Sequence, residues 1–120
     1  MAHYVDGFLL PVPKKNLAAY RRMSQNAGKV WREYGALEFR ECVADDLNVK
    51  MGASFRKSAK AKPSETVFFS YIVYKSRAHR DQVNKKVMKD PRITKDMDMK
   101  SMPFDVKRMA YGGFKTLVDL

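Results

Sequence analysis

An aspartate interrupts an apolar run near the start of the chain. Asp6 lies within residues 3–10, whose other members are almost all apolar or small and predict a strand. A carboxylate on a buried strand costs several kcal/mol unless a cation pairs with it. Arg108, on a last strand expected over residues 106–114, is the cation that we expect beside Asp6, because a bidentate pair would keep the carboxylate ionised.

This pair has two interpretations. As a structural ion pair, which is the default, it fixes the register of two strands. As a functional site, it would use Asp6 as a base or hydrogen-bond acceptor and Arg108 as a clamp for an anion. Tyr111 and Tyr71 are the aromatic side chains expected to line the same cavity, although core packing is the commoner role of buried tyrosines.

The surrounding pattern predicts a single α+β domain over residues 1–120. Apolar residues at helical spacing follow the first strand, Gly35 stands where a helix C-cap belongs, and Ser76 is placed to begin a second helix. Residues 44–65 have no sustained period and predict an excursion with a short helix around Phe55. The expected order is strand 3–10, ended by Pro11 and Pro13, helix 14–34, strands 37–43 and 67–74, a helix from 76 to about 90, and strand 106–114. This is the βαββαβ order of a ferredoxin-like fold with a four-stranded antiparallel sheet and both helices on one face.

The strand at residues 67–74 is apolar on both of its faces. Two helices cover only one face of a four-stranded sheet, so the other face needs a partner. The economical partner is a second copy of the same sheet, and we therefore predict a homodimer in which two sheets pair into an α+β barrel.

Charge favours an alternative function. The chain has 24 Lys and Arg against 13 Asp and Glu, a net charge of +11, and such a basic domain attracts polyanions. The basic residues are spread over several segments, whereas nucleic-acid-binding proteins concentrate charge on one face. A salt-sensitive RNA or DNA contact through Arg56, Lys57, Lys60 and Lys62 is the alternative to a solvated loop.

Other chemistry finds little support in the sequence. No run is long and apolar enough to cross a membrane, and the first residues enter a strand instead of a signal peptide, so we expect a cytoplasmic protein. Cys42 is the single cysteine, with Glu41 pointing to the opposite face of its strand, so we expect an inert thiol. The two histidines lack metal-ligand spacing, and Met97, Met99 and Met102 fit core filling better than a soft metal. No cofactor and no metal is predicted.

Essentially the whole chain resembles a known family. Its matching stretches are Tyr4–Phe8 with Pro13, Gly35–Leu37 with Glu41 and Cys42, Phe55–Lys57, Val67–Arg92, and the most specific block, MPFDVKRMAYGGF at residues 102–114. These are similar to the small uncharacterised bacterial proteins of the YbaA-like family, in the dimeric α+β barrel superfamily. The resemblance implies the fold and the dimer, and little about activity. Haem-degrading members of the superfamily use a histidine where this chain has residues 84–90, which contain none.

The leading hypothesis is a homodimer that binds a small metabolite in a pocket of each subunit, an anion being the case in which Arg108 acts as a clamp. A basic RNA- or DNA-associated protein and a structural or regulatory dimer without a ligand are the alternatives. The sequence leaves open whether any reaction is catalysed, because related folds host both enzymes and binding proteins.

Overall fold

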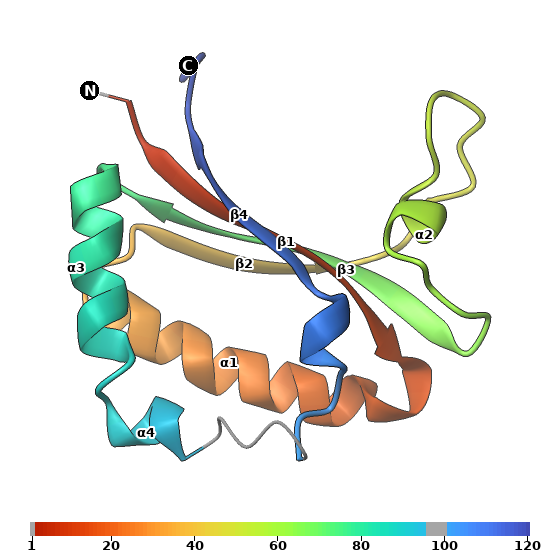
Figure 1. Cartoon of the computed structure of the whole chain (residues 1–120), viewed down its shortest axis with the longest axis horizontal. Coiled ribbons are helices and arrows are strands. Elements are labelled where there is room, and N and C mark those ends of the chain that lie inside the picture. The colour runs from red at the N-terminus through yellow and green to blue at the C-terminus, as the bar shows by residue number, and fades with distance from the viewer. Residues whose placement is uncertain (1, 96–100) are drawn as a thin grey trace.

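The computed structural model describes residues 2–95 and 101–120 (Figure 1). The predicted order is confirmed: the main elements follow one another as strand, helix, strand, strand, helix, strand, and the sheet has the antiparallel order β2-β3-β1-β4. The strands are β1 (Tyr4–Pro13), β2 (Glu38–Val43), β3 (Glu65–Tyr74) and β4 (Ala110–Lys115). The helices are α1 (Leu17–Glu33), α2 (Phe55–Ser58), α3 (Arg77–Val87) and α4 (Pro91–Thr94), with short 3-10 helices η1 (Lys14–Asn16) and η2 (Val106–Arg108).

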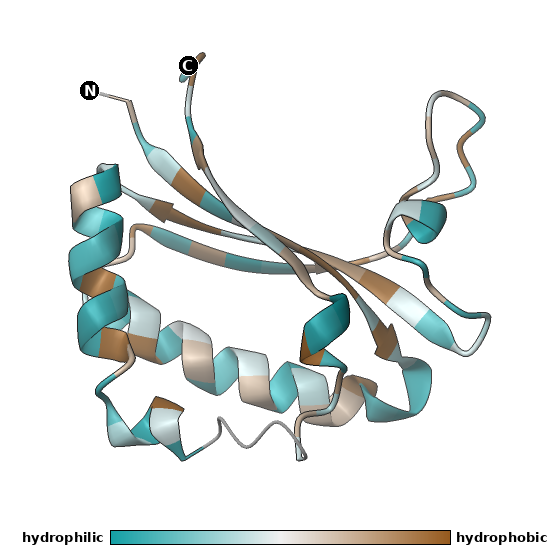
Figure 2. Cartoon of the chain, viewed as in Figure 1, coloured by the Kyte–Doolittle hydropathy of each residue, from teal (hydrophilic) through white to brown (hydrophobic). Residues whose placement is uncertain are grey.

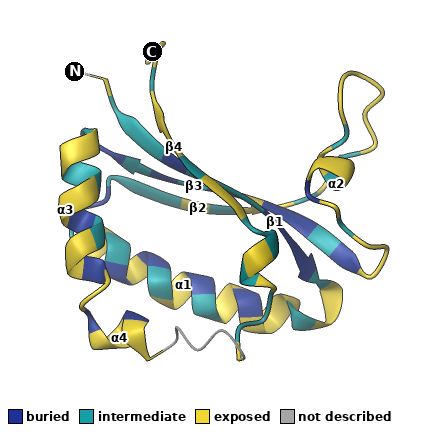
Figure 3. Cartoon of the chain, viewed as in Figure 1, coloured by how far each residue is buried: buried dark blue, intermediate teal, exposed yellow. Residues whose placement is uncertain are grey.

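Helices α1 and α3 lie against one face of the sheet and leave the other face without a helical cover (Figure 1). Strands β1 and β3 are rich in apolar residues, and the buried residues of α1 lie on its side toward the sheet (Figures 2 and 3). Two clusters form the core. One joins Val30, Ile72, Tyr74 and Val83 near α3, and the other joins Leu10, Val12, Tyr20 and Phe68 near the start of α1.

The predicted end of the first strand is wrong. We expected the prolines after Leu10 to stop it, but β1 continues through Pro11 to Pro13 and pairs with β3 over its whole length. Its pairing with β4 ends earlier, at Leu9 opposite Ala110. Beyond that point β1 has one neighbour only, so a proline without an N–H group is tolerated on its unpaired side.

The predicted last strand is also too long at its beginning. Residues Val106–Arg108 form the 3-10 helix η2, and β4 begins at Ala110. Asp105 starts this turn, because its carboxylate accepts a hydrogen bond of 3.0 Å from the Lys107 backbone N–H. Arg108 therefore lies before the last strand and not on it.

The excursion at residues 44–65 contains the expected short helix around Phe55. This helix, α2, begins at Ser54, whose hydroxyl accepts from the backbone N–H of Arg56. Its loop extends away from α1 and α3, toward the open side of the sheet (Figure 1). The Phe55 ring lies 6.4 Å from Phe69 on that open face, so the excursion covers one end of it.

Candidate functional site

A cavity of about 390 Å³ lies between the sheet and its helices. Its floor is formed by alternate residues of the strands and its roof by α1, α3 and the segment before β4. Most of the lining is apolar, with a few polar side chains at two places. The residues used below are Asp6, Phe8, Tyr20, Ser24, Ala27, Trp31, Phe39, Glu41, Ser70, Tyr74, Asn84, Met102 and Tyr111.

Asp6 lies at one end of this cavity and is 1% exposed. Its partner is Arg80 of α3, whose Nη1 donates to Oδ1 over 2.7 Å, and not Arg108 as predicted. Arg80 also donates a hydrogen bond of 2.8 Å to the Asp81 carboxylate and one of 3.2 Å to the Tyr111 hydroxyl. Its guanidinium lies 4.9 Å from the centre of the Tyr4 ring. The buried carboxylate is thus paired, by a cation that the sequence analysis did not consider.

Burial and pairing act on Asp6 in opposite directions. Burial raises the pKa of the Asp6 carboxyl above its ordinary value, while Arg80 and a hydrogen bond from Tyr111 lower it. The pKa of the Tyr111 hydroxyl is also raised, first by burial and then by the charge of Asp6. With its oxygens engaged by Arg80 and Tyr111, Asp6 is arranged as a structural ion pair that borders the cavity.

Arg108 forms a separate ion pair at the other end of β1. Its Nη1 and Nη2 donate to the two carboxylate oxygens of Glu65 over 2.6 and 2.9 Å, and Nη2 donates 2.7 Å to the Lys60 carbonyl. This bidentate contact lowers the pKa of Glu65 to about 2. The prediction of an Asp6–Arg108 pair is wrong because Arg108 precedes β4, beside the first residue of β3, whereas Asp6 is paired with the middle of β4.

The two candidate tyrosines lie on opposite faces of the sheet. Tyr111 is directly across from Phe8 and stacks on it at 5.0 Å, on the same face as Asp6, although it is 52% exposed. Tyr71 is across from Gly7, and its ring lies 6.4 Å from Phe69 on the open face. Among the four predicted site residues, Asp6, Tyr71 and Tyr111 all border the cavity, but only Asp6 and Tyr111 lie on its side of the sheet.

A hydrogen-bond network next to Asp6 was missed. The Asn84 side-chain oxygen accepts two hydrogen bonds, one of 3.0 Å from the Trp31 indole N–H and one of 3.1 Å from the Tyr74 hydroxyl. Burial and the nearby Asp6 charge raise the pKa of Tyr74 above its ordinary range. The strand register could have revealed this network. Strand β3 ends opposite the start of β1, so α3, which follows β3, must begin beside Asp6.

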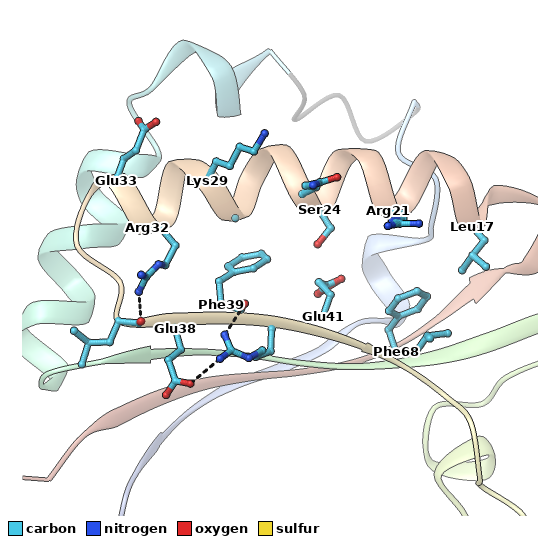
Figure 4. A pocket seen from close by; sticks show the side chains of 15 residues that line it. Leu17, Arg21, Ser24, Lys29, Arg32, Glu33, Glu38, Phe39, Glu41 and Phe68 are labelled. Carbon is cyan, nitrogen blue, oxygen red and sulfur yellow. Dashed lines mark hydrogen bonds and ion pairs between the residues drawn. The ribbon is translucent and has the colours of Figure 1, made fainter.

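A second polar group lies in the cavity near the middle of α1. Glu41 of β2 is directly across from Ser70 of β3, so both project toward α1, and Figure 4 shows the Glu41 carboxylate pointing toward Ser24. Ser70 is 3% exposed, and neither its hydroxyl oxygen nor Glu41 Oε2 has a hydrogen-bond partner among the described residues. Cys42, next along the strand, is exposed on the other face, which confirms the predicted orientation of Glu41.

The basic segment of the alternative hypothesis is partly used for packing. Arg56 donates to the backbone carbonyls of Lys62 and Glu65 at 2.7 and 3.2 Å, so its guanidinium holds the loop against the start of β3. Lys57, Lys60 and Lys62 are exposed. Of the three predicted core methionines, Met102 lines the cavity, whereas Met97 and Met99 lie outside the described residues.

Two further observations concern the part of the chain that the structure describes. It holds no group of three or more His, Cys, Asp or Glu side chains arranged to bind a metal ion. None of its helices has the length and apolar character that crossing a bilayer requires.

The fold and the cavity define a ferredoxin-like α+β protein with a pocket between the sheet and its helices. Two solved structures share this fold: a dimeric ferredoxin-like protein from an uncultured marine organism (9% identity, all of both chains, TM-score 0.59) and an uncharacterised NIPSNAP domain protein from Burkholderia xenovorans (12% identity, 92% of this chain and 91% of that chain, TM-score 0.57). At such identities the likeness shows the fold alone.

The sequence relatives are more specific. Residues 3–106 match a family described as "Protein of unknown function (DUF1428)". The uncharacterised protein YbaA of Escherichia coli strain K12 is 45% identical over 116 residues, which cover 97% of each chain, and YbaA of Shigella flexneri matches equally well. The chain belongs to this family of uncharacterised proteins, which confirms the resemblance found in the sequence.

Proposed function

We propose that the protein is a homodimer that binds a small, largely apolar molecule in the cavity of each subunit. The cavity itself carries this proposal: about 390 Å³ between sheet and helices, with an apolar lining and a few polar groups that converge on it. Ligand sites of globular proteins have this construction and this size.

The structure gives little support to an anionic ligand. Arg108, the expected anion clamp, is occupied by Glu65 and does not line the cavity. Arg80 is held by Asp6 and Asp81, so its charge is already compensated. The apolar character of the lining, and not a free cation, is what supports ligand binding.

The open face of the sheet supports the dimer. It presents an apolar, shallow groove of about 630 Å³ formed by β1, β3 and β4, with Val5, Leu9, Phe69, Tyr71 and Phe114 among its residues. Exposed apolar surfaces of this kind mark association sites, and a two-fold pairing of identical sheets covers both copies at once. The similar fold from the uncultured marine organism is described as dimeric.

The dimer proposal predicts that Phe69→Glu gives a monomer. Phe69 is half exposed on the open face, so a glutamate there is tolerated by one subunit but is buried without a partner between two. Multi-angle light scattering after gel filtration is expected to give about twice 13.9 kDa for the wild type and 13.9 kDa for the variant. Met51→Glu, in the exposed loop, is the control that stays dimeric. A wild-type mass of one chain would contradict the proposal.

Ligand binding is tested with 2-phenylethanol, a neutral molecule that has an apolar body and fits the cavity. In a ¹H–¹⁵N correlation spectrum we expect it to shift the Trp31 indole and Asn84 side-chain signals, which lie at the cavity, and to leave the Gly7 and Gly112 amides of the open face unchanged.

Two leucine substitutions on α1 provide the matched comparison. Ala27→Leu, which fills the cavity, should abolish these shifts, and Ala18→Leu, on the exposed part of the helix, should preserve them. Shifts confined to the open face would mean that the cavity is not the binding site.

A further inference from the structure

The cavity has one end at which hydrogen-bonding capacity is used up. Asp6 is bound by Arg80, and the Asn84 side-chain oxygen already accepts from two donors, Trp31 and Tyr74. A ligand that reaches this end finds charges and hydrogen bonds that are internally compensated. Specific polar recognition must therefore come from elsewhere in the cavity.

The other polar group retains unused acceptors. The hydroxyl of Ser70 is buried at 3% exposure, lines the cavity and has no hydrogen-bond partner among the described residues. Glu41 Oε2, across the strand pair, is buried and equally unpartnered. A buried polar group that no protein atom satisfies is destabilising, and an unpaired carboxylate more so, so a ligand that satisfies both groups recovers that cost.

The Glu41 charge also lacks an ion-pair partner in the part of the chain that the structure describes. The neighbouring Arg40 is engaged elsewhere: its guanidinium contacts Glu38 at 3.2 Å and donates to the Phe39 carbonyl. Tyr20 borders both groups: burial, then the Glu41 charge and a contact with that carboxylate, raise the pKa of the Tyr20 hydroxyl above the ordinary range, and a contact with Ser70 lowers it. Among the described residues, no hydrogen bond of ordinary geometry reaches Glu41 Oε2 or the Ser70 hydroxyl oxygen. A phenol can donate to Glu41 but brings no positive charge.

An approach to Glu41 exists from outside. A groove of about 1000 Å³ runs between α1 and the edge strand β2, and Ser24, Phe39 and Glu41 line both this groove and the cavity (Figure 4). The Phe39 ring fills the space beside Gly28, where an added Cβ would lie 2.7 Å from it. Glu41 thus lies where an entering molecule passes from the groove to the apolar interior.

We propose that the ligand is an apolar molecule with a protonated amine, and that the amine binds the Glu41 carboxylate and the Ser70 hydroxyl while the apolar body fills the cavity. An ammonium group has three donors and no acceptor, so it matches two unpartnered acceptors and compensates the lone charge. This assignment rests on the proposed function, because it names the ligand class of the same cavity. It replaces the anionic ligand expected from the sequence.

Three probes with the same phenyl body test the assignment: 2-phenylethylamine, 2-phenylethanol and 3-phenylpropanoate, titrated by calorimetry at about 0.15 M salt. Screening over about 8 Å at that salt limits the effect of the net charge of +11, which by itself favours the anion. The amine should bind at least about tenfold more tightly than the carboxylate, since a hydrogen bond to a charged group is stronger than one between neutral groups.

The variants assign this preference to residues. Glu41→Gln should weaken the amine about tenfold or more and change the alcohol less than about threefold. Ser70→Ala should weaken both the amine and the alcohol, because it removes an acceptor that serves either. Asp45→Asn is the control, since it removes the same charge from an exposed position that lines neither the groove nor the cavity, and it should leave all three affinities unchanged.

Two results would overturn the inference while leaving the cavity as a ligand site: a carboxylate that binds as tightly as the amine, or an amine whose affinity Glu41→Gln does not change. If none of the probes binds, the proposed function itself fails and the assignment fails with it. If Glu41→Gln does not fold, the ranking of the probes on the wild type and on Ser70→Ala still decides.

Discussion

Replacing Arg80 with methionine is expected to destabilise the fold by about 3–5 kcal/mol at neutral pH, because it leaves the Asp6 carboxylate buried without its cation. Methionine keeps most of the aliphatic length of Arg80 and removes the guanidinium, together with its contact on the Tyr4 ring, so the loss reports mainly on charge. Equilibrium unfolding in urea measures the change. Arg77→Met, at an exposed position of the same helix, is the control and should change stability little.

The pH dependence of this variant distinguishes a lost ion pair from lost packing. Burial already raises the pKa of Asp6, and without Arg80 the pKa rises further, so the folded state holds the proton more tightly than the unfolded chain does. A group with a raised folded pKa favours folding at low pH and loses that contribution as pH rises through the folded pKa. The deficit of Arg80→Met should therefore shrink as the pH is lowered toward 4.

Two results would contradict this account of Asp6 and Arg80. A deficit that is constant from neutral to acidic pH would assign it to packing. The double variant Asp6→Leu with Arg80→Met removes both charges, and it should recover much of the stability, since a buried pair replaced by apolar residues is often neutral. If the double variant is less stable than Arg80→Met alone, the unpaired carboxylate is not the cause.

The sequence predicted the fold because its strongest signals are local and periodic. Alternating and helical apolar patterns fix the two main helices and four strands, and the both-sided apolar character of residues 67–74 correctly marks a central strand. Prolines misled the prediction at the end of β1, where the effect of a missing N–H group depends on whether β4 still runs alongside. That information is tertiary and is absent from the local pattern.

The ion pairs were harder to predict than the strands. Asp6 was recognised because a charge in an apolar run is conspicuous, but its partner depends on where each chain segment ends. Arg108 was placed on the last strand, but it lies two residues before β4 begins at Ala110. The true partner, Arg80, lies among many arginines and lysines without a distinguishing pattern. Ser70 and Glu41 were overlooked as a pair because their significance comes from the β2–β3 register.

The second ion pair, between Glu65 and Arg108, should make the protein sensitive to acid. The pKa of Glu65 falls from its ordinary 4.5 to about 2 through the Arg108 hydrogen bonds, and the side chain is 6% exposed, so solvent screens the contact little. A group with a lowered folded pKa stabilises the fold above its unfolded pKa and loses that contribution as pH falls through the folded pKa. The contribution of about 3 kcal/mol should therefore be complete above pH 4.5 and disappear progressively toward pH 2.

Glu65→Gln tests this directly, because glutamine keeps the shape and cannot titrate. We expect it to lose about 2–3 kcal/mol at pH 7 and to flatten the stability profile between pH 4.5 and 2, as measured by urea unfolding at each pH. Glu33→Gln breaks an exposed pair with Arg92 and is the matched control that should leave most of the acid sensitivity in place. An unchanged profile in Glu65→Gln would show that the Arg108 contact does not set the acid stability. The two ion pairs therefore respond to pH in opposite ways. The buried Asp6 carboxylate destabilises the fold unless Arg80 offsets its charge, whereas the Glu65 contact with Arg108 is stabilising on balance.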